Sequence, residues 1–200
     1  MPIMIGKKLK MSQIWKGEEV IPVTLIQAGP IAVTQLRTSE KDKYEAIQVG
    51  FEHGSKKISK PLAGHLKGLK NFRFLKEFRL NEKTDCKVGD MLDISQFAEG
   101  DKVVVSGLDK GRGFQGTVKR HGFHGGPKTH GQKDRLRAPG SIGSTAPQRV
   151  MPGRKMAGRM GQSRKTVKNL EIISIDKENN ILAVKGAVPG MRGTLLEISK

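Results

Sequence analysis

The sequence has few of the features that mark a secreted, membrane-spanning or thiol-dependent protein. Its 200 residues include one cysteine, Cys86, so no disulfide can form within the chain. Nothing near Cys86 indicates an activated thiolate, and we expect an inert thiol. No apolar run approaches the roughly 18 residues that span a bilayer, and MPIMIGKKLKM at the N-terminus lacks the apolar stretch of a signal peptide. We therefore expect a soluble, intracellular protein with no membrane partner.

Acidic residues are nearly absent from residues 110–165, called the basic segment below. It holds 14 of the 37 Lys and Arg residues but only one of the 19 acids, Asp134, and so carries +13 of the formal +18 charge. It also contains twelve glycines, four prolines and large apolar residues too sparse to bury a core, such as Phe114, Phe123, Leu136, Ile142 and Val150. It cannot offset an ordering entropy of roughly 1–2 kcal/mol per residue. Such a segment is either disordered or ordered by a polyanion, and nucleic acid is the commonest polyanion of defined shape.

Outside the basic segment the pattern is typical of β-strands. β-Branched runs at 20–28 and 31–37, separated by Gly29 and Pro30, predict two strands with a tight turn between them. Further strands are predicted at 44–52, 87–94, 101–106, 166–175 and 180–185, and residues 176–179 join the last two as a hairpin turn. Strands therefore precede and follow the basic segment. We infer a mainly β protein in which residues 1–109 and 166–200 form a β-barrel and residues 110–165 protrude as a long loop.

One short helix is predicted at about residues 59–70. Ser59 can cap it, Pro61 lies near its first turn, and helical spacing is kept by Leu62, Leu66 and Leu69. Phe74 and Phe78 follow at regular spacing. Although aromatic rings among cations can stack on bases, regular spacing favours a buried face, so we expect both rings in the core.

The glycine-rich start of the basic segment, GRGFQGTV at 111–118, also fits the dinucleotide fingerprint and the kinase glycine-rich loop. The dinucleotide pattern needs an apolar helix to begin at the third glycine, and residues 117–122 do not read as a helix start. Asp134, the only acid near the required distance, lies in no predicted strand. The kinase His-Arg-Asp and Asp-Phe-Gly motifs are absent. We expect these glycines to let the backbone approach phosphates, with no nucleotide cofactor.

Three histidines, His121, His124 and His130, raise the possibility of a metal site. No cysteine accompanies them and the only nearby acid is Asp134, whereas zinc usually takes four well-placed ligands. Histidines that stack or form hydrogen bonds in an RNA-facing loop are the preferred interpretation. No catalytic arrangement of side chains can be argued from spacing. We therefore expect no metal site, no small-molecule substrate and no enzymatic activity.

The expected RNA contacts lie in the basic segment, where cations bind phosphates and glycines allow close backbone approach and contacts to 2′-hydroxyls. The predicted RNA-binding residues are Arg112, Gly113, Lys119, Arg120, His121, His124, Lys128, His130, Lys133, Arg135, Arg137, Ser141, Ser144, Arg149, Arg154, Lys155, Arg159 and Arg164. Charge nearly vanishes at 140–148, a stretch called the tip below. The tip is either a flexible turn or a backbone packed in a narrow space.

Five stretches in order together resemble the bacterial form of the ribosomal protein L3 family: GKKLKMSQIW, GRGFQGTVKRHGF, APGSIG, KMAGRMG and AVKGAVPGMRG. The resemblance runs over the whole chain. It implies a six-stranded Greek-key barrel of the translation-protein type, seated on large-subunit ribosomal RNA early in assembly, next to neighbouring ribosomal proteins in the cytoplasm. It also implies that the long loop reaches toward the peptidyl transferase centre.

Two positions depart from the family. Asp109 stands where members often have a small hydroxyl residue, and Ser144-Thr145-Ala146 stand where some members have a methylated glutamine, so we expect no such modification. Two other classes stay open from the residues alone. A DNA-architectural protein would fit the charge but would usually show a groove-reading helix or β-ribbon with dimer symmetry. A nucleotide-dependent enzyme would fit only the glycine pattern.

Overall fold

The computed structural model describes residues 2–54, 58–80 and 86–200. The chain divides into two compact units, one made of residues 1–108 with 164–200 and the other of residues 109–163. From the sequence, these boundaries were predicted at 109/110 and 165/166. Each unit is described by itself below.

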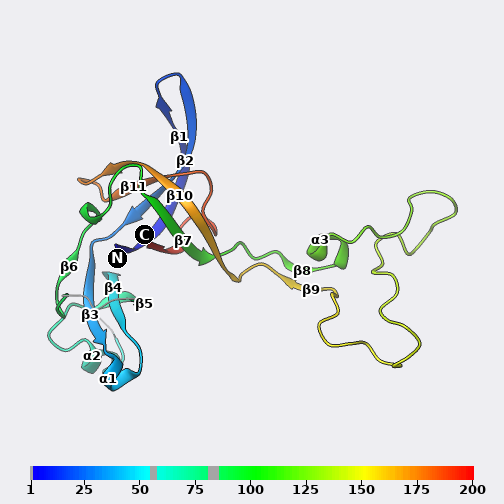
Figure 1. Ribbon diagram of the computed structural model, residues 1–200, viewed down its shortest axis with the longest axis horizontal. Coiled ribbons are helices and arrows are strands. Elements are labelled where there is room, and N and C mark those ends of the chain that lie inside the picture. Colours follow the sequence, from blue (N-terminus) through cyan, green and yellow to red (C-terminus); the bar gives the residue numbers. More distant parts are fainter. Residues whose placement is uncertain (1, 55–57, 81–85) are drawn as a thin grey trace. The chain divides into compact units, whose positions relative to one another are not determined.

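A ring of six antiparallel strands forms the centre of the first unit (Figure 1). Each strand bonds to the next in the order β1-β12-β7-β10-β11-β2, and β2 bonds back to β1, which closes the barrel. The strands are β1 (Ile3–Lys16), β2 (Glu19–Ala28), β7 (Lys102–Leu108), β10 (Arg164–Asp176), β11 (Ile181–Lys185) and β12 (Leu195–Ser199). Register shifts interrupt β1 and β10. Such bulges bend a strand and increase its twist, as closure of a small barrel requires.

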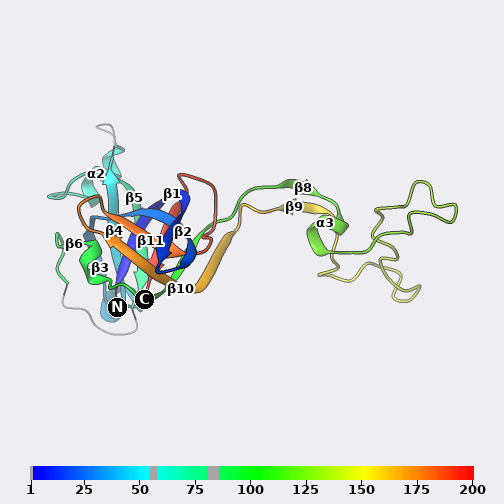
Figure 2. The same cartoon turned by 90° about the horizontal axis from the view of Figure 1, so that it is seen from above.

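Aliphatic side chains fill the core of the first unit, and on β1 and β11 consecutive residues are buried. Met4, Ile5, Leu182, Leu196 and Ile198 have no exposed surface and belong to one continuous hydrophobic cluster. Closure also leaves fewer exposed strand edges than an open sheet would have. The distal part of the β1–β2 hairpin extends beyond the ring in Figure 1, and Figure 2 views the same hairpin nearly end-on.

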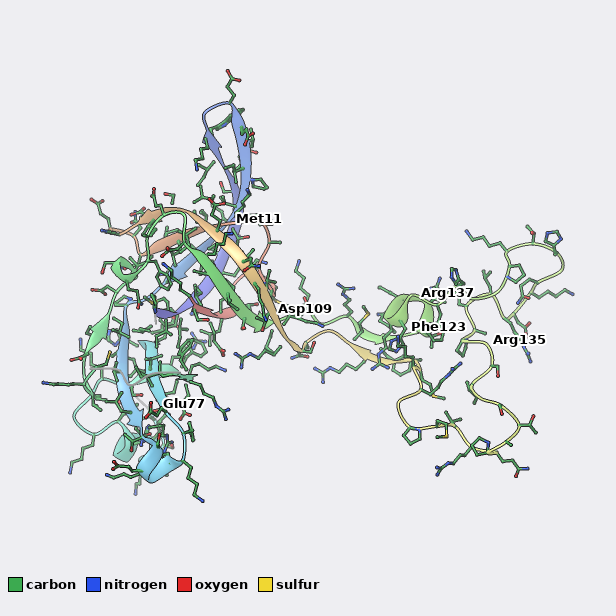
Figure 3. The ribbon with its side chains drawn as sticks, in the orientation of Figure 1. Met11, Glu77, Asp109, Phe123, Arg135 and Arg137 are labelled. Carbon is green, nitrogen blue, oxygen red and sulfur yellow. The ribbon has the colours of Figure 1, made fainter. Side chains whose placement is uncertain are left out.

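A second, four-stranded antiparallel sheet has the order β5-β4-β3-β6. It contains β3 (Ile31–Arg37), β4 (Ala46–His53), β5 (Phe72–Arg79) and β6 (Met91–Leu92), and it is accompanied by α1 (Ser39–Asp42), α2 (Lys60–His65) and the 3₁₀ turn η1 (Ile94–Gln96). Most of its buried residues, among them Ile31, Val49 and Phe78, join the same cluster as the barrel core, whereas Ala32 and Phe72 pack with Leu66 in a separate cluster. The two sheets therefore share one core. Glu77 of β5, labelled in Figure 3, accepts hydrogen bonds from Arg37, Tyr44 and Gln48.

The prediction of a mainly β protein is confirmed, and several strands lie where the sequence predicted them. β3 matches residues 31–37, and Phe78 is buried in the core with Phe74 packed partly against it. The turn after β10 is a hairpin turn as predicted. There the Asp176 carboxylate accepts hydrogen bonds from the backbone N–H groups of Glu178 and Asn179 and from the Asn179 side chain. These bonds, that from the Asn179 side chain first, hold the pKa of Asp176 below its ordinary value.

Other expectations for the first unit differ from the structure. The predicted helix at 59–70 is the six-residue α2, and Ser59 at its N-cap makes no side-chain capping bond. The helix ends at His65, and the turn that follows is closed by a hydrogen bond from the Leu69 N–H to the Leu66 carbonyl. Within this turn Gly68 has a φ of +84°, outside helical geometry, so the helix does not continue to residue 70. The predicted strand at 87–94 shrinks to β6, because Gly89 has a φ of +100° and the Asp90 carboxylate accepts the Lys87 N–H to form a turn.

The turn at Gly29 and Pro30 lies between strands of different sheets. β2 belongs to the barrel and β3 to the four-stranded sheet, so this turn carries the chain from one sheet to the other. The sequence analysis did not identify β1, β5 or β12 as strands. Its count of strands was therefore too low on both sheets.

Candidate nucleic-acid interface

The basic segment leaves and rejoins the barrel between two neighbouring strands. Leu108 at the end of β7 is paired with Arg164 at the start of β10. Beyond them, the Asp109 N–H donates to the Ser163 carbonyl at 2.9 Å and the Arg112 N–H to the Met160 carbonyl at 2.9 Å. The short strands β8 (Gly113–Gln115) and β9 (Gly158–Met160) continue this ladder. The root of the second unit is thus a narrow two-stranded ribbon.

Gly161 makes the close approach at this root possible. Its φ is +75°, and a Cβ atom placed there would lie 2.0 Å from the Lys110 carbonyl oxygen. A side chain at this position would push the two segments of the ribbon apart. The sequence motif KMAGRMG therefore has a local structural reason for its last glycine.

A five-residue helix, α3 (Thr117–His121), follows the ribbon. The interpretation that no helix starts after Gly116 was wrong, because the chain makes one helical turn there before Gly122 ends it with a φ of +73°. The helix places Arg120 and His121 against the returning chain. The Arg120 guanidinium donates to the Met156 carbonyl at 2.7 Å, and the His121 Nε2 lies 3.1 Å from the same oxygen. The dinucleotide pattern needs a helix that continues, and α3 does not.

Residues 122–140 fold back on themselves after α3. The Gly126 N–H donates to the Leu136 carbonyl at 2.8 Å. When the Gln132 side-chain amide is oriented with its oxygen toward this turn, that oxygen accepts hydrogen bonds from the backbone N–H groups of Arg135 and Leu136. This turn encloses an open hollow of about 540 Å³, lined by residues that include Phe123, His124, Gln132, Arg135 and Pro139. Phe123, Arg135 and Arg137 are labelled in Figure 3.

The tip, residues 140–148, is held by local turn bonds. The Ser141 hydroxyl donates to the Gly143 carbonyl at 2.9 Å and the Ser144 hydroxyl to the Ala146 carbonyl at 2.6 Å. The Arg154 guanidinium donates to the Ser141 carbonyl. Every residue of the tip is exposed. Both predicted serine contacts can therefore offer RNA only their acceptor lone pairs in this conformation, because each hydroxyl proton is already bonded.

The predicted cations divide into two groups. Four have internal partners: Arg120 and Arg154 as above, Arg159 with Gln162, and Arg164 with Glu197 of β12. In the larger group the side chains have neither a hydrogen bond nor an ion pair within the described residues, and the group consists of Arg112, Lys119, Lys128, Lys133, Arg135, Arg137, Arg149 and Lys155. All eight are exposed. This leaves a set of cations with no counter-charge from the protein.

Burial in the second unit is minimal. Of residues 109–163, all of which are described, only Thr117 is buried, at 3% exposed. Its hydroxyl has no hydrogen-bond partner among the described residues. His124 and His130 are exposed, and His121 is engaged with Met156 and with the ring of Phe123, whose centroid is 6.1 Å away. A segment that buries so little surface cannot offset its own conformational entropy, so its conformation has to be stabilised by contacts outside the unit.

Two further structural observations concern the described part of the chain. No group of three or more His, Cys, Asp or Glu side chains lies close enough there to hold a metal ion. None of the helices described has the length and apolarity needed to cross a membrane.

On sequence alone, Phe114 counted only as an apolar residue too isolated for a core, yet in the structure it is 77% exposed on β8. Its position among cations was the signal that could have marked it as a binding residue.

Comparison with known proteins agrees with the sequence resemblance. The profile of the family described as ribosomal protein L3 matches residues 78–200. The large ribosomal subunit protein uL3 of Herpetosiphon aurantiacus is 52% identical over 202 residues, covering 98% of this chain and 95% of that protein. The proteins of the same name from Roseiflexus sp. and Fervidobacterium nodosum are 49% and 47% identical, covering 98% and 99% of this chain and 96% and 97% of theirs. Identity at this level over almost the full length shows that the chain belongs to the ribosomal protein L3 family.

Proposed function

We propose that this chain is a structural, non-enzymatic component of the large ribosomal subunit in the cytoplasm, and that it binds large-subunit ribosomal RNA through its basic segment. One observation carries the proposal: the segment has a single buried residue and ten exposed cations whose side chains have no partner in the described chain, the eight named above together with Lys110 and Lys165. RNA phosphates would supply both the missing counter-charge and the missing packing.

The two units then have separate tasks. The barrel has its own continuous hydrophobic core. The basic segment has none, so its conformation would be fixed by the RNA around it. This division supports a part in which the barrel is a folded anchor and the segment penetrates RNA. Because membership of the family implies them, we also propose the Greek-key connectivity of the barrel, contacts with neighbouring ribosomal proteins, action early in subunit assembly, and a tip that reaches toward the peptidyl transferase centre.

The test is the salt dependence of binding to protein-free large-subunit ribosomal RNA. Affinity should fall steeply with salt, because each neutralised phosphate adds about 0.9 to the log–log slope on a duplex and about 0.7 on a single strand. Arg135→Ala removes an exposed cation without a partner, and it should flatten the slope by about one unit if its side chain makes one phosphate contact. Lys177→Ala, in the exposed β10–β11 turn, is the matched control and should leave the slope unchanged.

Competition decides between nucleic acids. Excess duplex DNA should displace the protein far less well than excess ribosomal RNA, since residues 110–165, all of them described, contain no helix longer than the five-residue α3 to enter a groove. Equal competition by duplex DNA would favour an architectural DNA-binding protein instead. Unchanged slopes for both Arg135→Ala and Lys155→Ala would show that these side chains face solvent rather than phosphates.

A further inference from the structure

Phe114 is an aromatic side chain without a structural use in the protein. Its ring is 77% exposed, the largest exposed fraction among the exposed large hydrophobic side chains of the described chain. It belongs to none of the three hydrophobic clusters. Phe123, nine residues later in the sequence, is by contrast partly buried and lies beside His121. The ring of Phe114 is therefore free to meet a partner.

The ribbon around Phe114 leaves room for a flat ligand. A Cβ atom added at Gly113 or at Gly116 would meet nothing within 4 Å, so the backbone on either side of Phe114 is bare. The backbone of Phe114 itself is fixed by pairing of β8 with β9, where it lies directly opposite Arg159. Directly opposed residues of an antiparallel pair point to the same face, with Cβ atoms about 4.5–5.5 Å apart. The pairing of β8 with β9 thus places the Phe114 ring and the Arg159 guanidinium on the same face of the ribbon.

The surrounding charge indicates what this pair binds. The basic segment has 14 cations and one acid, and the guanidinium of Arg112, two residues before Phe114, has no partner in the described chain. Cores of protein–protein interfaces are depleted of charge, whereas proteins that bind single-stranded nucleic acid combine cations for the backbone with aromatic rings for the bases. A nucleobase is accordingly the partner that matches both the ring and its setting. A base inside a duplex is already stacked on both faces, so the partner has to be unpaired.

We propose that Phe114 stacks on an unpaired nucleobase of large-subunit ribosomal RNA, with the Arg159 guanidinium beside the same nucleotide. The proposal rests on the RNA binding proposed above and adds a contact of a different kind. Phosphate contacts bring affinity that depends on salt, and a stacked ring brings affinity that does not. The ribbon would in this way fix the position of the segment where it leaves the barrel.

The experiment measures affinity of the full-length protein for protein-free large-subunit ribosomal RNA over a range of salt concentrations. Phe114→Ala should weaken binding by about 5- to 150-fold, the range for loss of one base–aromatic stack, at an unchanged salt slope. Phe114→Tyr should bind like the wild type and Phe114→Leu should bind nearly as weakly as Phe114→Ala. Met151→Ala, which removes another exposed apolar side chain of the segment, is the matched control and should change little.

A fluorescent variant reports the stack directly. Trp15 is the only tryptophan of the chain and lies outside the segment. In a Trp15→Phe background, Phe114→Trp introduces a single indole at the proposed site, and its emission should be quenched when RNA binds. The unchanged thermal unfolding of every variant would show that the exposed ring does not contribute to the fold.

The outcomes separate this proposal from the function on which it rests. If the wild type binds ribosomal RNA with a steep salt slope but Phe114→Ala or Phe114→Leu binds equally well, RNA binding stands and the stacking proposal fails. It fails too if the introduced indole is not quenched, or if Phe114→Ala binds RNA normally but is depleted from assembled subunits, which would assign the ring to a protein contact. A wild type that shows no salt-dependent binding at all would overturn the proposed function itself.

Discussion

Removal of the basic segment should leave a folded barrel that is somewhat more stable than the intact protein. The variant replaces residues 110–162 by Asn-Gly, so that Asp109-Asn-Gly-Ser163 connects Leu108 to Arg164. The geometry allows this because Leu108 and Arg164 are already paired and the Asp109 N–H donates to the Ser163 carbonyl at 2.9 Å. Asn-Gly is a preferred pair for a two-residue hairpin turn. No buried core residue is lost except Thr117.

The size of the gain follows from the length of the connection. Residues 109–163 form a connection of 55 residues, and the variant has four. This shortening is almost four halvings, each worth about 0.6 kcal/mol of closure entropy, so the free energy of unfolding should rise by about 2 kcal/mol. For the domain that remains, the melting temperature should rise by roughly 5 °C.

Urea denaturation followed by circular dichroism, together with a thermal melt, measures both quantities. The same variant should lose salt-dependent binding to ribosomal RNA. A variant that fails to fold, or one that is less stable than the intact chain by more than about 1 kcal/mol, would refute the reasoning. It would mean that the basic segment contributes packing to the barrel.

Three further predictions follow from particular residues. Leu182→Ala truncates a fully buried side chain of the barrel core and should cost about 2–5 kcal/mol in urea denaturation without changing the salt slope of RNA binding; a cost below about 1 kcal/mol would show a poorly packed interior. The pKa of Asp176 is lowered chiefly by the hydrogen bond from the Asn179 side chain, so its stabilisation is present above the unfolded value of about 3.9 and is lost as pH falls through the lower folded value. Asp176→Asn should therefore flatten the loss of stability on acidification below about pH 4, and an identical acid profile would exclude this contribution. Ser144→Arg and Gly143→Trp enlarge exposed tip residues and should leave folding and RNA binding nearly intact while slowing the puromycin reaction or altering inhibition by drugs of that site; unchanged values in fully assembled subunits would make the tip an ordinary turn.

The parts of the fold that sequence predicted are those with a strong local pattern. The apolar β-branched run of β3 and the polar turn at 176–179 carry their own signals, and both lie where expected. β1 was missed because its sequence, IMIGKKLKMSQIWK, contains four lysines and a glycine that break the alternation, and its strand conformation depends on pairing with β2 and β12. β12 was missed for a similar reason, because five residues are too few to show a period and its partners lie far away in sequence.

The candidate interface was predictable as a composition but not as a set of contacts. The charge of the basic segment could be counted, and eight of its ten cations whose side chains have no partner in the described chain were among the predicted residues; Lys110 and Lys165 were not. Sequence could not show that Arg120 and His121 share the Met156 carbonyl, since this contact joins residues 35 and 36 positions apart. It likewise could not show that Arg164 pairs with Glu197. Such pairings depend on the returning path of the chain, which no local pattern encodes.

The central claim is that the basic segment binds large-subunit ribosomal RNA, and crosslinking in cells followed by sequencing of the attached RNA tests it most directly. The account predicts a few discrete crosslink sites, all within the one large-subunit ribosomal RNA, which disappear when residues 110–162 are replaced by Asn-Gly. Crosslinks scattered over messenger RNAs or genomic DNA, or discrete ribosomal sites that persist in that variant, would contradict it.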